Sequence, residues 1–377
     1  MNICVNTVGH RRGVTAFHFQ YIVILYCDGY NGKMKRCLLE LDKLELCAEL
    51  KAEGLPAFRA EQIRQWVFAR KTADFAAMTN LSLDLRALLA EKYEIFCGKI
   101  IARHKSPDST EKLLIEWPDG HRVECVLLRD DRNHRTACIS SQVGCAMGCL
   151  FCASGLDGFV RNLTRGEILE QILRLNQLLP NTERLTHLVV MGTGEPLLNL
   201  SALLPALDEV TANDSLDLSR RRVTISTVGI PQGIDQLAEA GVTYRLAVSL
   251  HAPNDALRNT IVPQNRHAGI AKIIAATDRF FQATGRRITF EYVLIDRIND
   301  RPEHARELVQ LLKNRAIIVN LIPFNPVEGL PYRTPSTVAT KQFVELLERG
   351  GVDVKIRYKK GDPINAACGQ LRRSFRE

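Results

Sequence analysis

The chain has 377 residues, of which 46% are hydrophobic and 24% charged, as in a folded protein with one large domain and a smaller one. Its eleven cysteines are an odd number spread irregularly, which argues against a disulfide scaffold and favours reduced thiols in the cytoplasm. The net charge of +8 is compatible with a polyanionic partner, and no apolar run reaches the roughly 20 residues of a membrane span.

The first 33 residues differ in character from the rest of the chain. Residues 10–27 place charges before a short, aromatic-rich apolar run, but they lack the small-residue cleavage site of a signal peptide. We therefore expect no secretion. We treat residues 1–33 as an extension of unknown role, disordered or, if Met34 is the true start, not translated.

Residues 34–96 are predicted to form a small helical domain. Leucines recur at helical spacing over residues 38–54, and Ile63, Trp66 and Val67 share one stripe of the next helix. We expect exposed basic side chains here to dock RNA; the alternative is that the bundle only packs on its neighbour. These side chains are Arg59, Arg64, Arg70 and Lys71.

Residues 97–133 are predicted to connect this domain to the rest of the chain. Residues 112–128 contain two strand-like runs around a Pro-Asp-Gly turn, which indicates a β-hairpin.

From residue 134 to residue 377, strand-like runs alternate with amphipathic helices, which indicates an α/β domain with parallel strands. Six such units predict an incomplete β/α barrel. No G-x-G-x-x-G follows the first strand, so a dinucleotide-binding fold is not indicated. The expected strands are 136–141, 185–191, 222–227, 244–250, 287–295 and 316–324, with a seventh at 352–358.

Polar motifs follow most of these strands at their carboxyl ends, where the loops of a parallel barrel converge on the active site. One such motif would be unremarkable, but five are hard to explain by stability. They are the cysteine loop, "GTGEP" at 192–196, "STVG" at 226–229, "SLHAPN" at 249–254 and "NLIPFNP" at 320–326.

The cysteine loop "CAMGCLFC" places Cys145, Cys149 and Cys152 in eight residues. A structural zinc site needs four ligands, and a redox pair would leave Cys145 unused. Three thiolates suit a [4Fe–4S] cluster with one iron open to a substrate or cofactor. We favour the cluster, with zinc and inert buried thiols as the alternatives.

A C-x-x-x-C-x-x-C loop that opens a β/α barrel resembles the radical S-adenosylmethionine superfamily. Further motifs make the chain similar to the RlmN/Cfr family of 23S rRNA adenine methyltransferases, from about residue 54 to the C-terminus. They are "SSQVGCAMGCLFCASG", "MGTGEPLLN", "VSLHAPN", "IVPQN", "NLIPFNP" and "INAACGQLRR".

This resemblance implies one [4Fe–4S] cluster per chain and two S-adenosylmethionine molecules per turnover. It also implies that Cys368 carries the methyl group, that Cys138 releases the product by forming a disulfide with Cys368, and that Glu124 accepts a proton. One extra residue separates the Glu124 motif from Cys138. The implied cofactor-binding residues are Gly194, Glu195, Ser226, Ser249, Leu250, His251 and Asn325.

Two positions depart from the family pattern: Val228 stands where a small polar residue is expected, and Pro363 lies in the loop before Cys368. Core packing is the alternative for Cys138, a structural hydrogen bond for His251 and a solvated face for Glu124. We expect Arg132 and Arg135 to favour the thiolate of Cys138.

The implied function is methylation of C2 of an adenosine in 23S rRNA, with tRNA as a further substrate. The alternatives are C8 methylation of the same base and a non-catalytic iron–sulfur RNA-binding protein of ribosome assembly. An electron donor such as flavodoxin is implied, and no membrane is involved. Basic runs that suit RNA phosphates lie at Arg220–Arg222, Arg286, Arg287, Arg357, Lys359, Lys360 and the C-terminus.

Overall fold

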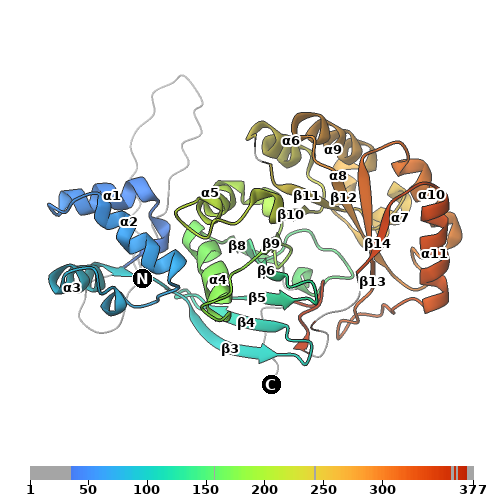
Figure 1. Ribbon diagram of the computed structural model, residues 1–377. Coiled ribbons are helices and arrows are strands. Elements are labelled where there is room, and N and C mark those ends of the chain that lie inside the picture. Colours follow the sequence, from blue (N-terminus) through green and yellow to red (C-terminus); the bar gives the residue numbers. More distant parts are fainter. Residues whose placement is uncertain (1–34, 157, 242, 358–360, 362–363, 372–377) are drawn as a thin grey trace, which may run out of the picture.

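The computed structural model describes residues 35–156, 158–241, 243–357, 361 and 364–371 of the chain. The described chain forms a helical N-terminal domain beside a curved mixed sheet with helices on its outer side (Figure 1). The extension at 1–33, Pro363 and the basic residues Lys359 and Lys360 lie outside the described residues.

A run of parallel strands forms the barrel, as the alternation of strands and helices predicted. Each strand pairs with the next in the order β6, β9, β10, β11, β12, β13 and β14, so the barrel stays open between its two edges. Their bounds are β6 (Arg135–Ile139), β9 (His187–Val190), β10 (Val223–Thr227), β11 (Arg245–Ser249), β12 (Ile288–Leu294), β13 (Ile317–Pro323) and β14 (Val354–Ile356).

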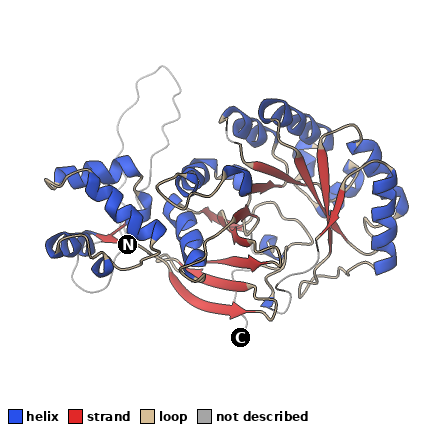
Figure 2. Ribbon diagram, viewed as in Figure 1, coloured by secondary structure: helices blue, strands red, loops and turns tan. Residues whose placement is uncertain are grey.

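Helices cover the convex side of this sheet and leave its concave side free for the site (Figure 2). Helix α4 begins at a capping box in which Thr164 and Glu167 satisfy each other's backbone N–H groups, and its apolar face is buried. The helices are α4 (Arg165–Gln177), α5 (Leu200–Thr211), α6 (Pro231–Glu239), α7 (Asp255–Ile261), α8 (Asn265–Ala268), α9 (Ile270–Thr284), α10 (Pro302–Leu312) and α11 (Thr337–Arg349).

The connecting segment is larger than the predicted hairpin. Strands β3 (Lys99–Lys105), β4 (Glu111–Glu116) and β5 (Arg122–Arg129) are antiparallel, and β5 also pairs with β6. The segment therefore extends the barrel sheet, because an antiparallel ribbon can hydrogen-bond to the open edge of a parallel sheet. A separate small hairpin of β7 (Gln142–Gly144) and β8 (Phe159–Asn162) flanks the cysteine loop.

The N-terminal domain is helical, as predicted, with α1 (Lys43–Ala52), α2 (Phe58–Arg64) and α3 (Leu83–Lys92). Ser82 caps α3, and strands β1 (Arg36–Cys37) and β2 (Tyr93–Glu94) pair with each other. Within the described ranges, every helix is too short or too polar to cross a lipid bilayer.

Two of the four basic side chains expected to dock RNA instead join this domain to the barrel. Arg64 is buried, and its Nη2 lies 2.7 Å from Oε1 of Glu209 on α5. Lys71 donates to three backbone carbonyl oxygens after α4, at 2.8 to 3.2 Å. Arg70 is exposed and stacks on Trp66 at 4.2 Å from the ring centroid. The prediction that Arg64 is exposed is therefore wrong.

Replacing Arg64 should loosen the contact between the two domains. In Arg64→Met, the buried carboxylate of Glu209 loses one of its cations, which we expect to cost about 2–4 kcal/mol. Urea unfolding and trypsin cleavage near residues 93–98 would measure this change. Arg59→Met is the matched control, because Arg59 bonds Gln62 within its own helix; an equal loss in both variants would contradict this role for Arg64.

Candidate active site

The cysteine loop lies at the carboxyl end of β6, where the sequence predicted it. Its backbone is fixed on several sides: Cys145 N donates to Gly158 O at 3.0 Å, and Leu150 N donates to Ile261 O at 3.0 Å. Cys145, Cys149 and Cys152 line one cavity of about 160 Å³ at the mouth of the barrel. The structure therefore brings the three predicted ligands together.

Burial raises the pKa of all three thiols, that of Cys145 to about 11. A bound metal centre would reverse this effect, because a thiol that coordinates a metal is deprotonated. In the described chain, no three Cys, His, Asp or Glu side chains converge closely enough to hold a single metal ion. Spaced thiols around one cavity fit a cluster better than mononuclear zinc, because each thiolate of a cluster binds a different iron.

The glycine-rich turn after β9 lets two strand ends approach closely. A Cβ on Gly192 would lie 2.6 Å from Ser140 Oγ, and a Cβ on Gly194 would lie 2.6 Å from the Gln142 side chain. Gly194 also has φ of +109°, which favours glycine. Both glycines line the cavity with Glu195. The turn thus places backbone and one carboxylate beside the cysteine loop.

Glu195 is a buried carboxylate aimed at this cavity. Its oxygens accept from Val228 N at 2.7 Å and Leu197 N at 3.0 Å, and burial raises its pKa to about 7. Val228, the departure from the family pattern, uses its backbone N–H here, so its side chain does not affect this bond. A bound ammonium group would stabilise the ionised carboxylate, which suits the amino group of S-adenosylmethionine.

His251 lines the cavity as a neutral imidazole. Its Nδ1 accepts from Val293 N at 3.0 Å, so the ring proton is on Nε2, and burial lowers its pKa to about 3. The ring also packs edge-on against Phe151 of the cysteine loop, with centroids 4.8 Å apart. His251 therefore makes a structural bond through one nitrogen and keeps a donor on the other for a ligand.

The remaining predicted cofactor residues divide into two groups. Ser226, Ser249 and Asn325 line the cavity. Leu250 is fully buried in the main core and is not among the lining residues, so its side chain does not reach the site. Asn325 Oδ1 is buried and has no hydrogen-bond partner among the described residues. This orphan acceptor is one that a ligand hydroxyl or ammonium group could satisfy.

The sequence analysis missed Arg258, which holds the ends of β10 and β11 together beneath this cavity. Its Nε donates to Leu250 O at 2.9 Å, and its Nη2 donates to Val228 O and Ser249 O at 2.5 and 2.9 Å. Burial lowers its pKa to about 10. The "LRNTIVPQN" run that contains Arg258 was the available signal.

Cys368 is exposed on a C-terminal segment that packs directly on the cysteine loop. Its carbonyl oxygen accepts from Asn325 Nδ2 at 3.1 Å, and the next carbonyl, of Gly369, accepts from Ala153 N at 2.8 Å. Ser154 Oγ donates to Leu371 O at 2.8 Å. The segment is thus tied to the loop that carries the three thiols.

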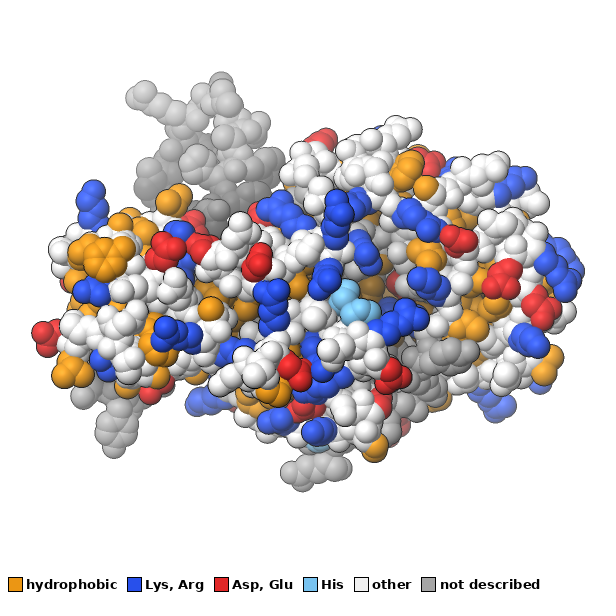
Figure 3. All heavy atoms as spheres, in the orientation of Figure 1, with side chains coloured by type: hydrophobic (Ala, Val, Ile, Leu, Met, Phe, Trp, Pro, Cys, Tyr) orange, Lys and Arg blue, Asp and Glu red, His pale blue; other side chains and the backbone are white. Residues whose placement is uncertain are grey.

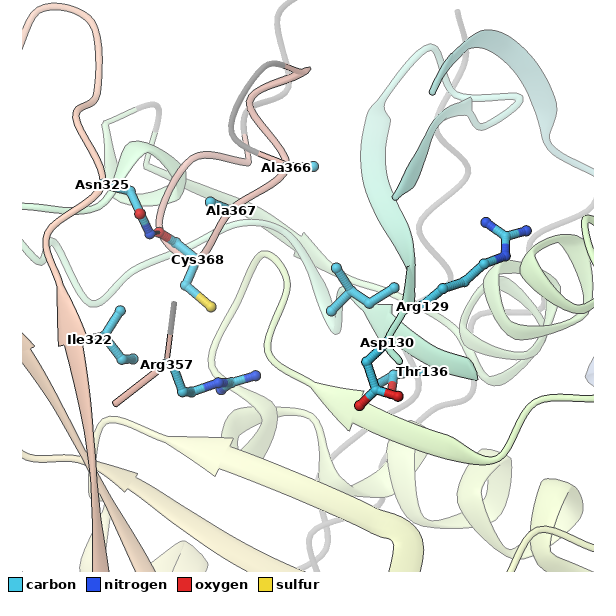
Figure 4. A pocket seen from close by; sticks show the side chains of 10 residues that line it. Arg129, Asp130, Thr136, Ile322, Asn325, Arg357, Ala366, Ala367 and Cys368 are labelled. Carbon is cyan, nitrogen blue, oxygen red and sulfur yellow. Dashed lines mark hydrogen bonds between the residues drawn. The ribbon is translucent and has the colours of Figure 1, made fainter. Parts of the chain in front are cut away.

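Cys368 lies between two cavities. The first is the cavity of the cysteine loop, and the second, of about 240 Å³, extends from Cys368 past Arg357 to Arg129, Asp130 and Thr136. In Figure 4 the sulfur of Cys368 points into the second cavity, above Arg357 and facing Thr136. A group carried by this sulfur can therefore meet ligands on both sides.

Cys138 lies on β6 behind this segment, where it packs against Ala366 and Leu371. Burial, and to a smaller extent the charge of Cys368, raises the pKa of the Cys138 thiol to about 12, and Arg357 opposes this rise. The positive charge beside Cys138 is therefore that of Arg357. The prediction for Arg132 and Arg135 is wrong, because neither is among the charges that act on Cys138, and Arg135 Nε instead lies 2.5 Å from Glu183 Oε2.

Arg357 was predicted to belong to a surface basic run that contacts RNA phosphates, but it is a residue of the site. It lines both cavities, and the neighbouring charge of Cys368 is the main effect that raises its pKa. Its Nη1 lies 3.9 Å from Glu291 Oε2 and 3.6 Å from Met191 Sδ. Its positive charge interacts with both candidate catalytic cysteines, Cys138 and Cys368.

Glu124 lies on β5 and is 5% exposed, so the alternative of a solvated face is wrong. It lines neither cavity; it is paired with Lys112, at 2.7 Å between Nζ and Oε1. The nine described cysteines are all free, so the predicted pairing of Cys138 and Cys368 is absent from this state of the chain.

Basic side chains gather over the middle of the face in Figure 3, around the barrel and the extended sheet. Several of the predicted basic runs are partly neutralised: Arg220 pairs with Asp208 at 3.1 Å, and Arg287 pairs with Asp353 at 2.6 Å. These residues are also exposed enough to exchange a carboxylate for a phosphate.

Comparison with known proteins identifies the family of this chain. Residues 139–312 match the radical SAM superfamily, and residues 37–95 match the ribosomal RNA large subunit methyltransferase N-terminal domain. A probable dual-specificity RNA methyltransferase RlmN from Rhodopirellula baltica is 56% identical over 91% of this chain and 92% of its own length. The same-named protein from Thermotoga maritima is 45% identical over 89% of this chain and 97% of its own.

The fold comparison points the same way. The crystal structure of a radical SAM methyltransferase from Sphaerobacter thermophilus covers 90% of this chain and 99% of its own, with a TM-score of 0.87 and 40% identity. Membership of the superfamily implies S-adenosylmethionine and an iron–sulfur cluster as cofactors. The chain therefore belongs to the RlmN family of radical S-adenosylmethionine RNA methyltransferases.

Proposed function

We propose that this enzyme methylates C2 of an adenosine in 23S rRNA and in tRNA, with Cys368 as the methyl carrier. The observation that supports this most strongly is the position of Cys368, which lines both the cofactor cavity and a second cavity beside it. A carrier must meet the methyl donor and the acceptor in turn. The name of the relatives, dual-specificity RNA methyltransferase, supports two kinds of RNA substrate, and the match of residues 37–95 to a ribosomal RNA large subunit methyltransferase domain supports rRNA as one of them.

Ordinary methyl transfer fails at C2 because this carbon is electron-poor and does not attack an electrophilic methyl group. General-base catalysis cannot correct that mismatch of polarity. A [4Fe–4S] cluster held by Cys145, Cys149 and Cys152 would supply the electron that cleaves S-adenosylmethionine to a 5′-deoxyadenosyl radical, and would accept the electron left over at the end.

The first steps take place on Cys368. Its thiolate displaces S-adenosylhomocysteine from one S-adenosylmethionine and keeps the methyl group. The 5′-deoxyadenosyl radical then removes one hydrogen atom from this S-methyl group, and the carbon radical that results adds to C2 of the adenine. Arg357 lines both cavities beside Cys368, so its positive charge lies close to the sulfur that takes the methyl group.

Release of the product needs a base and a second thiol. Glu124, which lines neither cavity in the chain without RNA, accepts the C2 proton once the adenine is bound within its reach. The Cys138 thiolate then attacks the sulfur of Cys368. A disulfide forms between the two cysteines as the carbon–sulfur bond breaks, and the methylene carbon leaves with the electron pair of that bond and takes a proton to become the C2 methyl group. An external thiol reductant must then reopen this disulfide before the next turnover. The packing of Cys138 against the Cys368 segment supports this pairing.

The reaction also needs an electron donor and a surface that binds RNA. A low-potential carrier such as flavodoxin would reduce the cluster in the cytoplasm, where the free cysteines would stay reduced. The basic face would contact RNA phosphates, and the target base would have to leave its stack, at a cost of a few kcal/mol.

A methyl-loading experiment tests the carrier. Full-length enzyme incubated with labelled S-adenosylmethionine is expected to carry a methyl group on the peptide that contains Cys368. Cys368→Ala should lose this label and RNA methylation by at least about 10³-fold, because no second nucleophile replaces the sulfur. Mass spectrometry would detect both products.

Cys47→Ala is the control for this experiment, because Cys47 lies in the N-terminal domain away from both cavities. Normal RNA methylation by Cys368→Ala would refute the carrier. Mapping the modified base separates C2 from C8, and absence of 5′-deoxyadenosine would support the non-catalytic alternative.

A further inference from the structure

A buried ion pair lies behind the catalytic segment and lines neither cavity. Lys112 on β4 and Glu124 on β5 are 7% and 5% exposed, with 2.7 Å between Nζ and Oε1. The two strands are antiparallel neighbours, and Glu124 is opposite Leu114 in their register. Both charges therefore project from the same side of the extended sheet.

The same ammonium group reaches the Cys368 segment. Lys112 Nζ donates to the backbone oxygen of Asn365, three residues before Cys368, at 3.3 Å. A lysine ammonium has three N–H donors, so it can bond the carboxylate and the carbonyl together. Lys112 thus connects Glu124 to the backbone of the methyl-carrying segment.

Other contacts between the extended sheet and this segment surround Lys112. Asp108 Oδ2 accepts from Gly361 N at 2.7 Å, and Val126 packs against Ala366. A Cβ on Gly361 would lie 2.9 Å from Thr110, which shows how closely the two pieces of backbone approach. The segment is therefore seated on β4 and β5 by polar contacts at two points and by apolar packing.

Stability does not explain the choice of a lysine here. Removing two charges from water costs more than their attraction commonly returns, and apolar side chains of similar size often stabilise such a position. Lysine is also among the side chains least often buried. A buried pair at the base of the catalytic segment is better explained by what it holds in place.

Hydrogen bonds to the backbone of Glu124 hold this residue in place. Its backbone oxygen accepts from Ser140 Oγ at 2.8 Å, and the same Oγ accepts from Thr193 N of the glycine-rich turn at 2.9 Å. Lys112 joins Glu124 to the Cys368 segment, and Glu124 is therefore linked through Ser140 to the glycine-rich turn of the cofactor cavity. The Cys368 segment in turn presents its sulfur to two cavities.

We propose that Lys112 is a positioning residue: its ammonium group holds the Cys368 segment against Glu124, so that methyl carrier and proton acceptor keep a fixed arrangement. This inference rests on the roles proposed for Cys368 and Glu124. Lys112 is not proposed to contact substrate or cofactor. Its effect on methyl transfer passes through the segment that contains Asn365.

Hydrogen exchange in the reconstituted full-length enzyme tests the position of the segment. Lys112→Gln is expected to speed exchange of the amides in residues 364–371 by about 10-fold or more, with iron content unchanged, because the bridge to Asn365 weakens. Lys112→Arg keeps a charged donor and should restore slow exchange. Lys105→Gln, on the exposed end of β3, is the matched control.

The functional readout is the ratio of 5′-deoxyadenosine to methylated RNA. In Lys112→Gln we expect this ratio to rise about 10-fold and kcat to fall, with KM for RNA within about 3-fold, because cofactor cleavage continues while transfer is misaligned. A purely structural lysine would instead lower active enzyme without changing the ratio per folded molecule.

A second variant keeps the inference testable if Lys112→Gln fails to fold. Lys112→Met with Glu124→Met replaces both charges by apolar side chains that favour folding, and it should still show fast exchange in residues 364–371. Slow exchange there, or an unchanged ratio in Lys112→Gln, overturns the inference. If Cys368→Ala still methylates RNA, the proposed function fails instead, whatever the Lys112 variants show.

Discussion

The Cys138→Ala enzyme is expected to stop after one addition and to remain joined to its RNA. The proposed intermediate links adenine to Cys368 through a carbon–sulfur bond, which water does not readily break. A thiolate that attacks this sulfur is the natural agent of release, and Cys138 packs against the segment that holds Cys368. Multiple-turnover methylation should fall by at least about 10³-fold, as for loss of an essential nucleophile.

A denaturing gel measures this stall directly. The variant should still load iron and methylate Cys368, and in the presence of RNA its band should shift upward and return after nuclease digestion. Cys125→Ala is the matched control, because Cys125 is the neighbouring buried thiol on β5 and packs in the main core. Repeated turnover by Cys138→Ala with no shifted band would leave Cys138 as a core thiol.

The raised pKa of Cys138 adds a condition to this step. Burial keeps the free thiol protonated at neutral pH, so attack requires that the proton leave as the reaction proceeds or that the segment move to admit charge and water. Arg357 is the cation placed to stabilise the thiolate. Arg357→Met should therefore slow product release.

The order of elements in the barrel could be predicted because parallel strands leave a strong pattern. Runs such as residues 223–227 and 245–249 are short and apolar, and amphipathic helices separate them. The extended sheet was underestimated, since the strand at 99–105 is mostly exposed and has no clean alternation of polar and apolar residues. The pairing of this strand with β4 depends on tertiary contacts, which the local sequence pattern does not show.

Site residues could be predicted from the sequence where they lie close together in one loop with a characteristic spacing. Cys145, Cys149 and Cys152 were identifiable because their ligand role needs thiols close together in the chain. Lys112 and Arg357 could not be identified this way, because each acts on residues far along the sequence. A lysine on a strand and an arginine in a basic run look like surface residues until the fold buries Lys112 and turns the partly buried Arg357 toward the site.

Loss of any one cysteine of the loop should remove the cluster and all radical chemistry. We expect Cys149→Ala to lose nearly all bound iron after anaerobic reconstitution, whereas the unaltered chain should hold about four irons and matching sulfide. The reason is structural: the loop supplies three thiols around one cavity, and the described chain offers no other set that could replace the lost ligand. Iron and sulfide analysis, with the visible absorption spectrum, measures the outcome.

The fold itself should survive this change, which separates loss of the cluster from unfolding. Cys149 packs in a small apolar cluster with Met147 and Phe151, so removing its sulfur should cost only about 1 kcal/mol of stability. Cys125→Ala, which removes a buried thiol outside the cavity, should keep its iron. Stoichiometric zinc without sulfide in the unaltered chain would contradict the cluster. Full RNA methylation by Cys149→Ala would contradict the radical mechanism as a whole, because no electron source for cleaving S-adenosylmethionine would remain.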